Sequence, residues 1–190
     1  RMNFNDKSFK KIGDSSLIEI VIERLKPQVN IIAINSNTLD NNRKFNDLVV
    51  LNDSISGYLG PLVGVLTGLE WLKSRKENFT WLITIPVDSP FFPDDIVNSF
   101  VQNLGDEKII VAKSKEQIHP VIALWSLDLI EPLRKAITND TRKIDEFTKK
   151  IKMKVVNFPI IDYDPFFNIN NENDLLIAKK IFNVINSKGI

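Results

Sequence analysis

Cysteine is absent from this chain of 190 residues. Its absence excludes disulfide bonds, thiolate nucleophiles and cysteine-ligated zinc, and it is typical of a protein from a reducing compartment. The chain also lacks any apolar run near the roughly 20 residues that span a bilayer, and it shows no secretory signal. We therefore expect a cytoplasmic protein that does not associate with membranes.

An excess of charge of one sign is also missing. Lys and Arg total 25 against 24 for Asp and Glu, which gives a formal net charge of +1. This balance argues against a general surface for nucleic acids or membranes. Without an internal repeat or a low-complexity stretch, the chain is expected to form a single domain over residues 1–190 with a substantial core.

Helix-like and strand-like segments alternate along the chain. The apolar spacing over 17–25 is that of a helix buried on one face. Further helices are expected at 61–73, 93–104, 127–137, 142–151 and 173–186, and strands at 29–34, 47–51, 81–85, 108–112, 121–125 and 155–158. This alternation predicts an α/β fold with three layers, in which helices flank a Rossmann-like, mostly parallel sheet.

A single carboxylate, Asp88, follows the apolar strand predicted at 81–85. In open α/β sheets, ligands bind beyond the carboxyl ends of the strands. A hard oxygen donor at such a position suits Mg²⁺, which binds through one or two carboxylates together with substrate phosphates. The alternative is that Asp88 only caps the helix that follows.

Two earlier strands also end in short polar residues. Asn35 follows the strand at 29–34, and Asp53 follows the strand at 47–51. Parallel strands would bring these side chains and Asp88 to one edge of the sheet, where they can bind a ligand. Because Asn and Asp also form turns, a purely structural role is the alternative.

Three glycines spaced by four residues form a bare stripe on the helix predicted at 61–73. Glycine inside a helix costs about 0.5–1 kcal/mol relative to alanine, so three in register indicate a reason for their presence. We expect a ligand to approach Gly60 and Gly64 closely, and Gly68 to pack against a strand. Gly60 also lies at the helix entrance, where free amides favour anions.

Two cations, Arg1 and Lys7, precede the first predicted helix. Arginine presents a planar fork of donors and lysine a mobile point charge, and together they suit a polyphosphate. The alternative is that they are exposed basic residues without a role.

Several short motifs occur in a fixed order: Arg1-Met2, Asp6-Lys7, Asn35, Asp53-Ser54, Gly60-Pro61-Leu62-Val63-Gly64, Asp88-Ser89-Pro90, His119-Pro120 and Asn168-Ile169-Asn170. Over essentially its whole length the chain resembles the molybdenum cofactor guanylyltransferases (MobA-type enzymes). Their signature Leu-Ala-Gly-Gly-x-Ser-x-Arg-Met-Gly-x-x-Asp-Lys is matched from its Arg-Met onward, so we expect the full protein to carry a preceding strand and glycine loop. Asn3 stands where the family has glycine, and Asn is the next most tolerant residue of positive φ.

The resemblance implies the nucleotide-diphospho-sugar transferase type of fold and a nucleotidyl transfer. The terminal phosphate of molybdopterin attacks the α-phosphorus of GTP, pyrophosphate leaves, and molybdopterin guanine dinucleotide results. Mg²⁺ is the implied cofactor and Asp88 its ligand, while Arg1 and Lys7 stabilise the departing pyrophosphate. The implied nucleotide-binding residues are Lys7, Asn35, Asp53, Gly64 and Asp88, with Asn35 and Asp53 at the guanine base.

On the acceptor side, the resemblance implies that the basic residue Arg142 meets the phosphate of molybdopterin. Asn168 and Asn170 alternate along an extended segment and would reach the same phosphate or the metal, with capping of the last helix as the alternative. Other cofactor-biosynthesis proteins and acceptor molybdoenzymes are further implied partners. The role of His119 stays open, because a lone histidine is more often structural.

Two other functions compete with guanylyl transfer. One is a related nucleotidyltransferase that uses CTP or a sugar phosphate, and the other is a non-catalytic, nucleotide-binding relative. The polar pair Asn35 and Asp53 favours guanine over other bases. The absent glycine loop and Asn3 are the two features that favour the non-catalytic relative.

Overall fold

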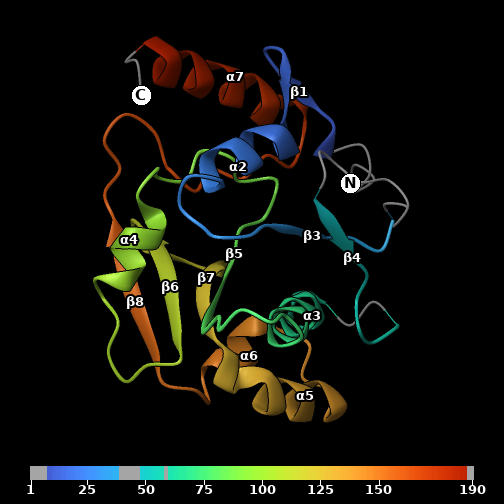
Figure 1. Cartoon of the computed structure of the whole chain (residues 1–190). Helices are drawn as coiled ribbons and strands as arrows, with labels where there is room; N and C mark the ends of the chain where they lie inside the picture. The colour runs from blue at the N-terminus through green and yellow to red at the C-terminus, as the bar shows by residue number, and fades with distance from the viewer. Residues whose placement is uncertain (1–7, 39–47, 58–59, 188–190) are drawn as a thin grey trace.

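The computed structural model describes residues 8–38, 48–57 and 60–187 of the chain (Figure 1). Its first half contains β1 (Lys11–Ile12), β2 (Ser15–Ser16), α2 (Leu17–Leu25), β3 (Ala33–Asn35), β4 (Val49–Leu51), α3 (Pro61–Lys73) and β5 (Trp81–Thr84). Its second half contains α4 (Ile96–Val101), β6 (Ile109–Ser114), β7 (Gln117–Ser126), the 3₁₀ turn η1 (Leu127–Leu129), α5 (Ile130–Thr138), α6 (Ile144–Thr148), β8 (Met153–Phe158) and α7 (Glu172–Ser187). Within these residues, no helix has the length and apolar character that crossing a bilayer requires.

The central sheet is mixed, although we expected mostly parallel pairing. Its strand order is β5-β7-β6-β8, and β7 runs antiparallel to both β5 and β6, while β6 and β8 are parallel. The reason is a short hairpin: Ser114 of β6 pairs with Gln117 of β7, and a connection of two residues can join only antiparallel strands. Strands β3 and β4 form a separate parallel pair.

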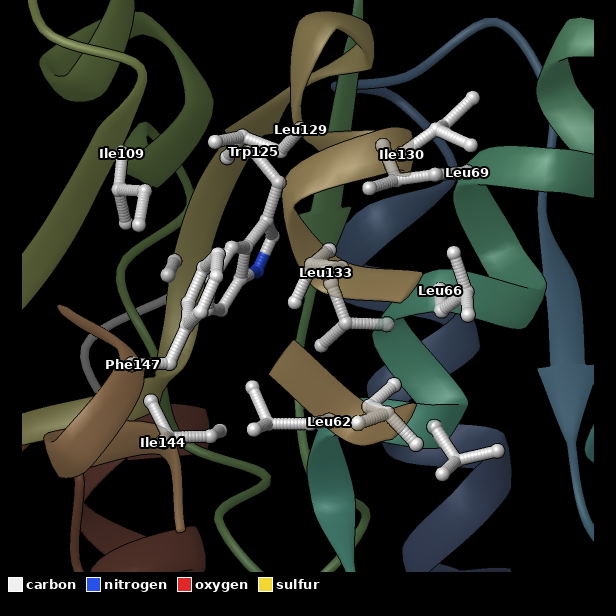
Figure 2. Close-up of a cluster of buried hydrophobic side chains, with 14 of the residues drawn as sticks. Leu62, Leu66, Leu69, Ile109, Trp125, Leu129, Ile130, Leu133, Ile144 and Phe147 are labelled. Atoms are coloured by element: carbon white, nitrogen blue, oxygen red, sulfur yellow. The ribbon is translucent and has the colours of Figure 1, made fainter. Parts of the chain in front are cut away.

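Side chains of the central sheet alternate between two covered faces, as in the predicted three-layer arrangement. Ile109 and Val111 of β6 belong to a core cluster with residues of α3, α5 and α6, which Figure 2 shows. Ile110 and Ala112 of the same strand belong to a second cluster with residues of α2 and α4. The α/β fold with helices on both faces of the sheet is thus confirmed.

Trp125 of β7 is the largest fully buried side chain of the first cluster (Figure 2). Its indole Nε1 donates to Thr84 Oγ1 at 2.9 Å, and that hydroxyl donates to the carbonyl of Val121 at 2.6 Å. Burial of an indole N–H without a partner would be unfavourable, so Thr84 removes this penalty. The same hydroxyl ties the end of β5 to β7.

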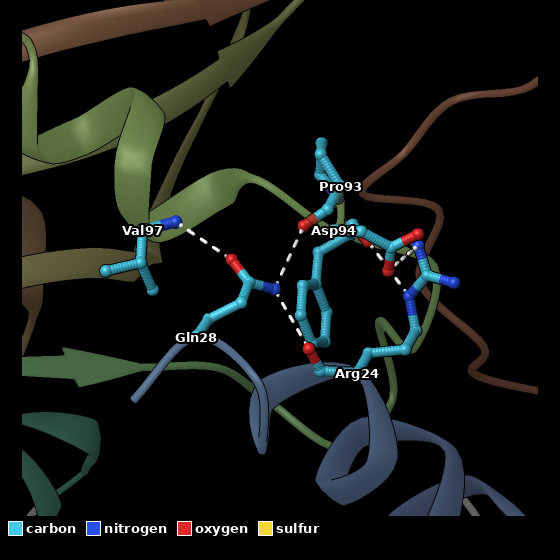
Figure 3. A network of polar contacts seen from close by, with 6 residues as sticks. Arg24, Gln28, Pro93, Asp94 and Val97 are labelled. Atoms are coloured by element: carbon cyan, nitrogen blue, oxygen red, sulfur yellow. Dashed lines mark hydrogen bonds and ion pairs between the residues drawn. The ribbon is translucent and has the colours of Figure 1, made fainter. Parts of the chain in front are cut away.

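Helix α2 is held to the segment before α4 by two long polar side chains (Figure 3). Arg24 donates through Nε and Nη2 to the carbonyl of Phe92, at 3.0 and 2.7 Å, and Arg24 Nη2 lies 2.9 Å from Asp94 Oδ1. Gln28 Oε1 accepts from the backbone N–H of Val97 at 3.2 Å. These bonds fix the start of α4 relative to α2.

The N-terminus of α2 carries a complete capping box. The backbone N–H of Ser16 donates to Glu19 Oε2 at 2.7 Å, and the Glu19 N–H donates to Ser16 Oγ at 3.4 Å. The box fixes where α2 begins, and its Ser16 is also the last residue of the short hairpin of β1 and β2.

Loss of this cap should destabilise the protein. Ser16→Ala is expected to lower the free energy of unfolding by about 1 kcal/mol, because an N–H at the helix start loses its acceptor. Urea unfolding at neutral pH measures this change. Glu19→Gln retains an acceptor oxygen for the Ser16 N–H, so it should lower the free energy of unfolding by less. An unaltered free energy of unfolding in Ser16→Ala would contradict the role of the cap.

Candidate active site

Helix α3 places three glycines against three different segments of the chain. A Cβ added at Gly64 would lie 2.6 Å from Asn35 Oδ1, and one added at Gly68 would lie 2.9 Å from Leu82 Cδ2. At Gly60, with φ of +84°, the nearest atom is the carbonyl oxygen of Arg142 at 3.0 Å. The stripe therefore brings the helix backbone close to the end of β3, to β5 and to the α5–α6 connection.

These contacts refine the expected reasons for the glycines. Gly68 packs on Leu82 of β5, as predicted. Gly64 makes room for the amide of Asn35, and Gly60 supplies a positive φ directly before Pro61 starts the helix. The expected approach of a ligand to these two glycines stays a prediction.

Asn35 and Asp53 meet at the ends of the parallel strands β3 and β4. Asn35 Nδ2 donates to Asp53 Oδ1 at 3.1 Å. A third residue, Asn37, donates through Nδ2 to Asp53 Oδ2 at 2.7 Å and accepts through Oδ1 from the Asp53 N–H at 2.8 Å. The carboxylate of Asp53 is thus held between two side-chain amides.

The residue after Asp53 is anchored on α3. The Ser54 N–H donates to Oγ1 of the buried Thr67 at 2.8 Å.

Neither Thr67 nor Asn37 was predicted from the sequence. Asn37 lies two residues beyond Asn35, and this period-two spacing, which puts residues of an extended segment on one side, was the available signal. Thr67 is the one polar residue among the buried residues of α3, which was a weaker signal.

Asp88 is joined to the segment that leads into α7. Asn168 Nδ2 donates to Asp88 Oδ1 at 3.3 Å, and the N–H of the buried Ile169 donates to the Asp88 carbonyl at 2.8 Å. Helix α4 begins at Ile96 with Asp95 at its N-cap, so Asp88 is not the cap of that helix. The capping alternative for Asp88 is therefore wrong.

The two predicted acceptor asparagines lie in different settings. Asn168 contacts Asp88, whereas the N–H of Asn170 donates to Asp174 Oδ2 at 2.8 Å at the entrance to α7. The predicted cations Arg1 and Lys7, and Asn3 with them, lie outside the described residues.

The donors around Asp88 fit Mg²⁺. A carboxylate and a neighbouring amide offer hard oxygen atoms. Mg²⁺ is commonly held in this way, through one or two carboxylates, with water and substrate phosphates completing its octahedron.

An open hollow of about 410 Å³ lies where α3 begins. Its lining residues are Gly60, Pro61, Pro120, Val121, Arg142, Lys143, Ile144 and Asp145. Pro120 and Val121 belong to a bulge: Val111 pairs with Ala123 but Ala112 pairs with His119. Proline has no N–H to donate, so a break in the strand ladder at this position is expected.

Arg142 and Lys143 supply the positive charge of this hollow. Arg142 Nε donates to Asp140 Oδ1 at 2.8 Å, and Lys143 Nζ lies 3.7 Å from Glu146 Oε1. Both side chains are exposed. The lining also includes Asp145, so charges of both signs lie beside the N-terminus of α3.

His119 belongs to a network that anchors the segment carrying Asn168. Its Nε2 lies 2.9 Å from Ser114 Oγ, which donates to Asp164 Oδ1 at 2.8 Å. The same carboxylate oxygen accepts from the Phe166 N–H at 3.0 Å, and the ring centroids of His119 and Phe166 are 4.9 Å apart. These contacts give His119 a structural role.

This network makes stability depend on pH. Burial lowers the pKa of His119 below its usual 6.5, and the Asp164 carboxylate partly opposes the shift. As the pH falls, His119 therefore takes up a proton in the unfolded chain before it does so in the folded protein. The stability that neutral His119 contributes is complete above about pH 6.5 and is lost as the pH falls through the folded pKa.

Urea unfolding at about pH 7, 6 and 5 tests this dependence. The free energy of unfolding should fall toward acid pH, and His119→Gln, which keeps a donor for Ser114 Oγ but does not titrate, should show a smaller fall. Equal losses in the two proteins would contradict a depressed pKa at His119.

Comparison with known proteins agrees with the α/β fold described above and with the family that the sequence motifs indicated. Residues 1–153 match the family described as MobA-like NTP transferase domain. The chain is 39% identical over 184 residues to a molybdenum cofactor guanylyltransferase of Rhodopseudomonas palustris (strain BisB5), which covers 95% of this chain and 88% of that protein. A second, from Nitrobacter hamburgensis, is 38% identical over 95% of this chain and 88% of its own length.

Two solved structures share the fold at low sequence identity. Molybdopterin-guanine dinucleotide biosynthesis protein A from Archaeoglobus fulgidus has a TM-score of 0.70 at 20% identity, over 93% of this chain and 90% of that chain. A 2-C-methyl-D-erythritol 4-phosphate cytidylyltransferase from Thermus thermophilus has a TM-score of 0.69 at 13% identity, over 94% and 95%. These two matches show the fold alone. By the family match and the curated relatives, the chain belongs to the molybdenum cofactor guanylyltransferases of the MobA-like NTP transferase family, a family of nucleotidyltransferase enzymes.

Proposed function

We propose that this chain transfers GMP from Mg²⁺-bound GTP to molybdopterin and releases pyrophosphate. The observation that carries the proposal is the carboxylate of Asp53, held beside the amide of Asn35 at the ends of two parallel strands. The related proteins named molybdenum cofactor guanylyltransferase support the same reaction.

The Asp53 carboxylate suits guanine because it only accepts hydrogen bonds. Guanine presents two adjacent donors, N1–H and the exocyclic amine, which pair with the two oxygens of a carboxylate. Adenine has an acceptor at N1, so its binding would place two acceptors opposite each other. Sites built from such polar pairs discriminate strongly, since a mismatched base leaves groups without partners.

Asp88 would hold the metal on the nucleotide phosphates. Nucleotidyltransferases of this kind use a divalent metal ion, and we propose Mg²⁺ here because the donors are hard oxygens. Bound there, the ion would neutralise charge on the phosphates. Asn168 donates to the Asp88 carboxylate and would help to orient it, while Arg1 and Lys7 are proposed to stabilise the departing pyrophosphate.

The hollow at the start of α3 would bind the phosphate of molybdopterin, as its charge from Arg142 and Lys143 supports. Arg142 uses Nε for Asp140 and has further donors on the same guanidinium. An oxygen of the acceptor phosphate then forms a bond to the α-phosphorus as the bond to the leaving pyrophosphate breaks. In-line positioning and charge neutralisation suffice for this exchange, so no side-chain nucleophile is needed.

Calorimetry with GTP, CTP, ATP and UTP in the presence of Mg²⁺ tests the base and the metal site. The full-length protein should prefer GTP, and Asp88→Ala should weaken Mg²⁺-dependent GTP binding by at least about tenfold, with Asp88→Asn in between. Preference for CTP would keep the nucleotidyl transfer but assign the chain to a cytidylyl reaction. A folded protein that binds no nucleotide would contradict the proposal and favour a non-catalytic relative.

The glycine stripe offers a matched pair of variants. Gly64→Ala should displace the Asn35 amide and lower GTP affinity on the order of tenfold, because the bond that steadies Asp53 is lost. Gly68→Ala, whose methyl group would meet only the flexible end of Leu82, should alter thermal stability and leave GTP affinity unchanged. Calorimetric titration of both variants separates the two effects, and equal GTP affinities would contradict the role of Gly64.

A further inference from the structure

Asn37 makes two simultaneous contacts with a single residue. Its side-chain amide donates to Asp53 Oδ2 at 2.7 Å and accepts from the Asp53 backbone N–H at 2.8 Å. The two bonds close a ring that includes the backbone and the side chain of Asp53. Rotation of the Asp53 side chain would break the first bond while the second stays in place, so the ring fixes the orientation of the carboxylate.

This restraint matters because the strand ends are open to water. Asn35 and Asn37 are exposed and Asp53 is only half-buried, so packing alone does not hold the carboxylate. An ionised carboxylate has about four acceptor positions, two on each oxygen. Within the described part of the chain, Asn35 takes one position on Oδ1 and Asn37 takes one on Oδ2. One acceptor position on each oxygen is then left for a base.

We propose that Asn37 is a positioning residue for base selection, which presets the Asp53 carboxylate to accept from guanine N1–H and the exocyclic amine together. The inference rests on the proposed function, in which Asp53 reads the base. A carboxylate already held in one orientation loses less freedom when the base binds, so the binding energy is not spent on ordering the side chain.

A neighbouring residue provides a matched control. Asn52 Nδ2 donates to the Ser36 carbonyl at 2.8 Å, so it bridges the same two segments, 35–38 and 51–53, as Asn37 does. Among the described contacts it makes no bond to the Asp53 carboxylate. Asn52→Ala therefore loosens the segments without acting on the carboxylate directly.

The experiment compares calorimetric binding of GTP, ITP and ATP, each with Mg²⁺. ITP lacks the exocyclic amine of GTP, so the GTP-to-ITP affinity ratio reports on one hydrogen bond to the carboxylate. This ratio should fall roughly fivefold to tenfold in Asn37→Ala and remain unchanged in Asn52→Ala. ATP affinity, which reports on the phosphate contacts and on correct folding, should fall in neither Asn37→Ala nor Asn52→Ala.

A second variant separates the two contacts of Asn37. Asn37→Asp keeps an oxygen that accepts from the Asp53 N–H but replaces the donor to Oδ2 by a negative charge. It should lower the GTP-to-ITP ratio at least as much as Asn37→Ala, because two like charges repel. In an Asp53→Ala background, Asn37→Ala should have no further effect on the ratio.

The outcomes distinguish the inference from the function on which it rests. If Asp53→Ala lowers the GTP-to-ITP ratio and both Asn37 variants leave it unchanged, the positioning role is wrong and the base assignment stands. If Asp53→Ala itself leaves the ratio unchanged, Asp53 does not bind the exocyclic amine. The assignment of Asp53 to the base and the positioning role of Asn37 are then both overturned. An equal fall in Asn52→Ala and Asn37→Ala would show a general effect of the loop and overturn the inference as well.

Discussion

The candidate site depends on how closely helix α3 approaches its neighbours. Its apolar side chains between Leu62 and Leu69 belong to the main core, while its glycine face admits an amide at Gly64 and a leucine at Gly68. A side chain at Gly64 would displace the Asn35 amide, whereas one at Gly68 would press on the flexible end of Leu82. The helix backbone is therefore the common reference from which the end of β3, strand β5 and the hollow at the start of α3 take their positions.

The polar groups of the site are held by bonds between segments far apart in sequence. Asp53 is held by Asn35 and Asn37 across two parallel strands, and Asp88 by the segment before α7. That segment is in turn anchored through Asp164 to the β6–β7 hairpin. Such preset arrangements suit nucleotidyl transfer, in which the protein orients phosphates and compensates their charge.

Local signals in the sequence predicted much of this arrangement. Helices α2 and α3 have the predicted bounds, because apolar periodicity and a proline at the first position of α3 mark them clearly. Strand β7 starts four residues before the predicted 121, since Pro120 sits in a bulge within the strand instead of before it. The bond between Asn168 and Asp88 joins residues 80 positions apart, and the role of Asn37 depends on a side-chain rotamer. Period-two spacing puts these asparagines on one side of an extended segment, but the partner that each of them bonds is set by the fold and not by the local pattern.

The segment that supports Asp88 also bears on where the functional unit ends. The family match extends over residues 1–153, which includes only the first residue of β8 and stops before Asn168 and Ile169. A protein cut at that boundary would lose a strand at the edge of the sheet and both bonds that hold Asp88 from that side. The matched region therefore lacks both of these bonds to Asp88, and residues 154–187 help to position the candidate site as well as to complete the packing.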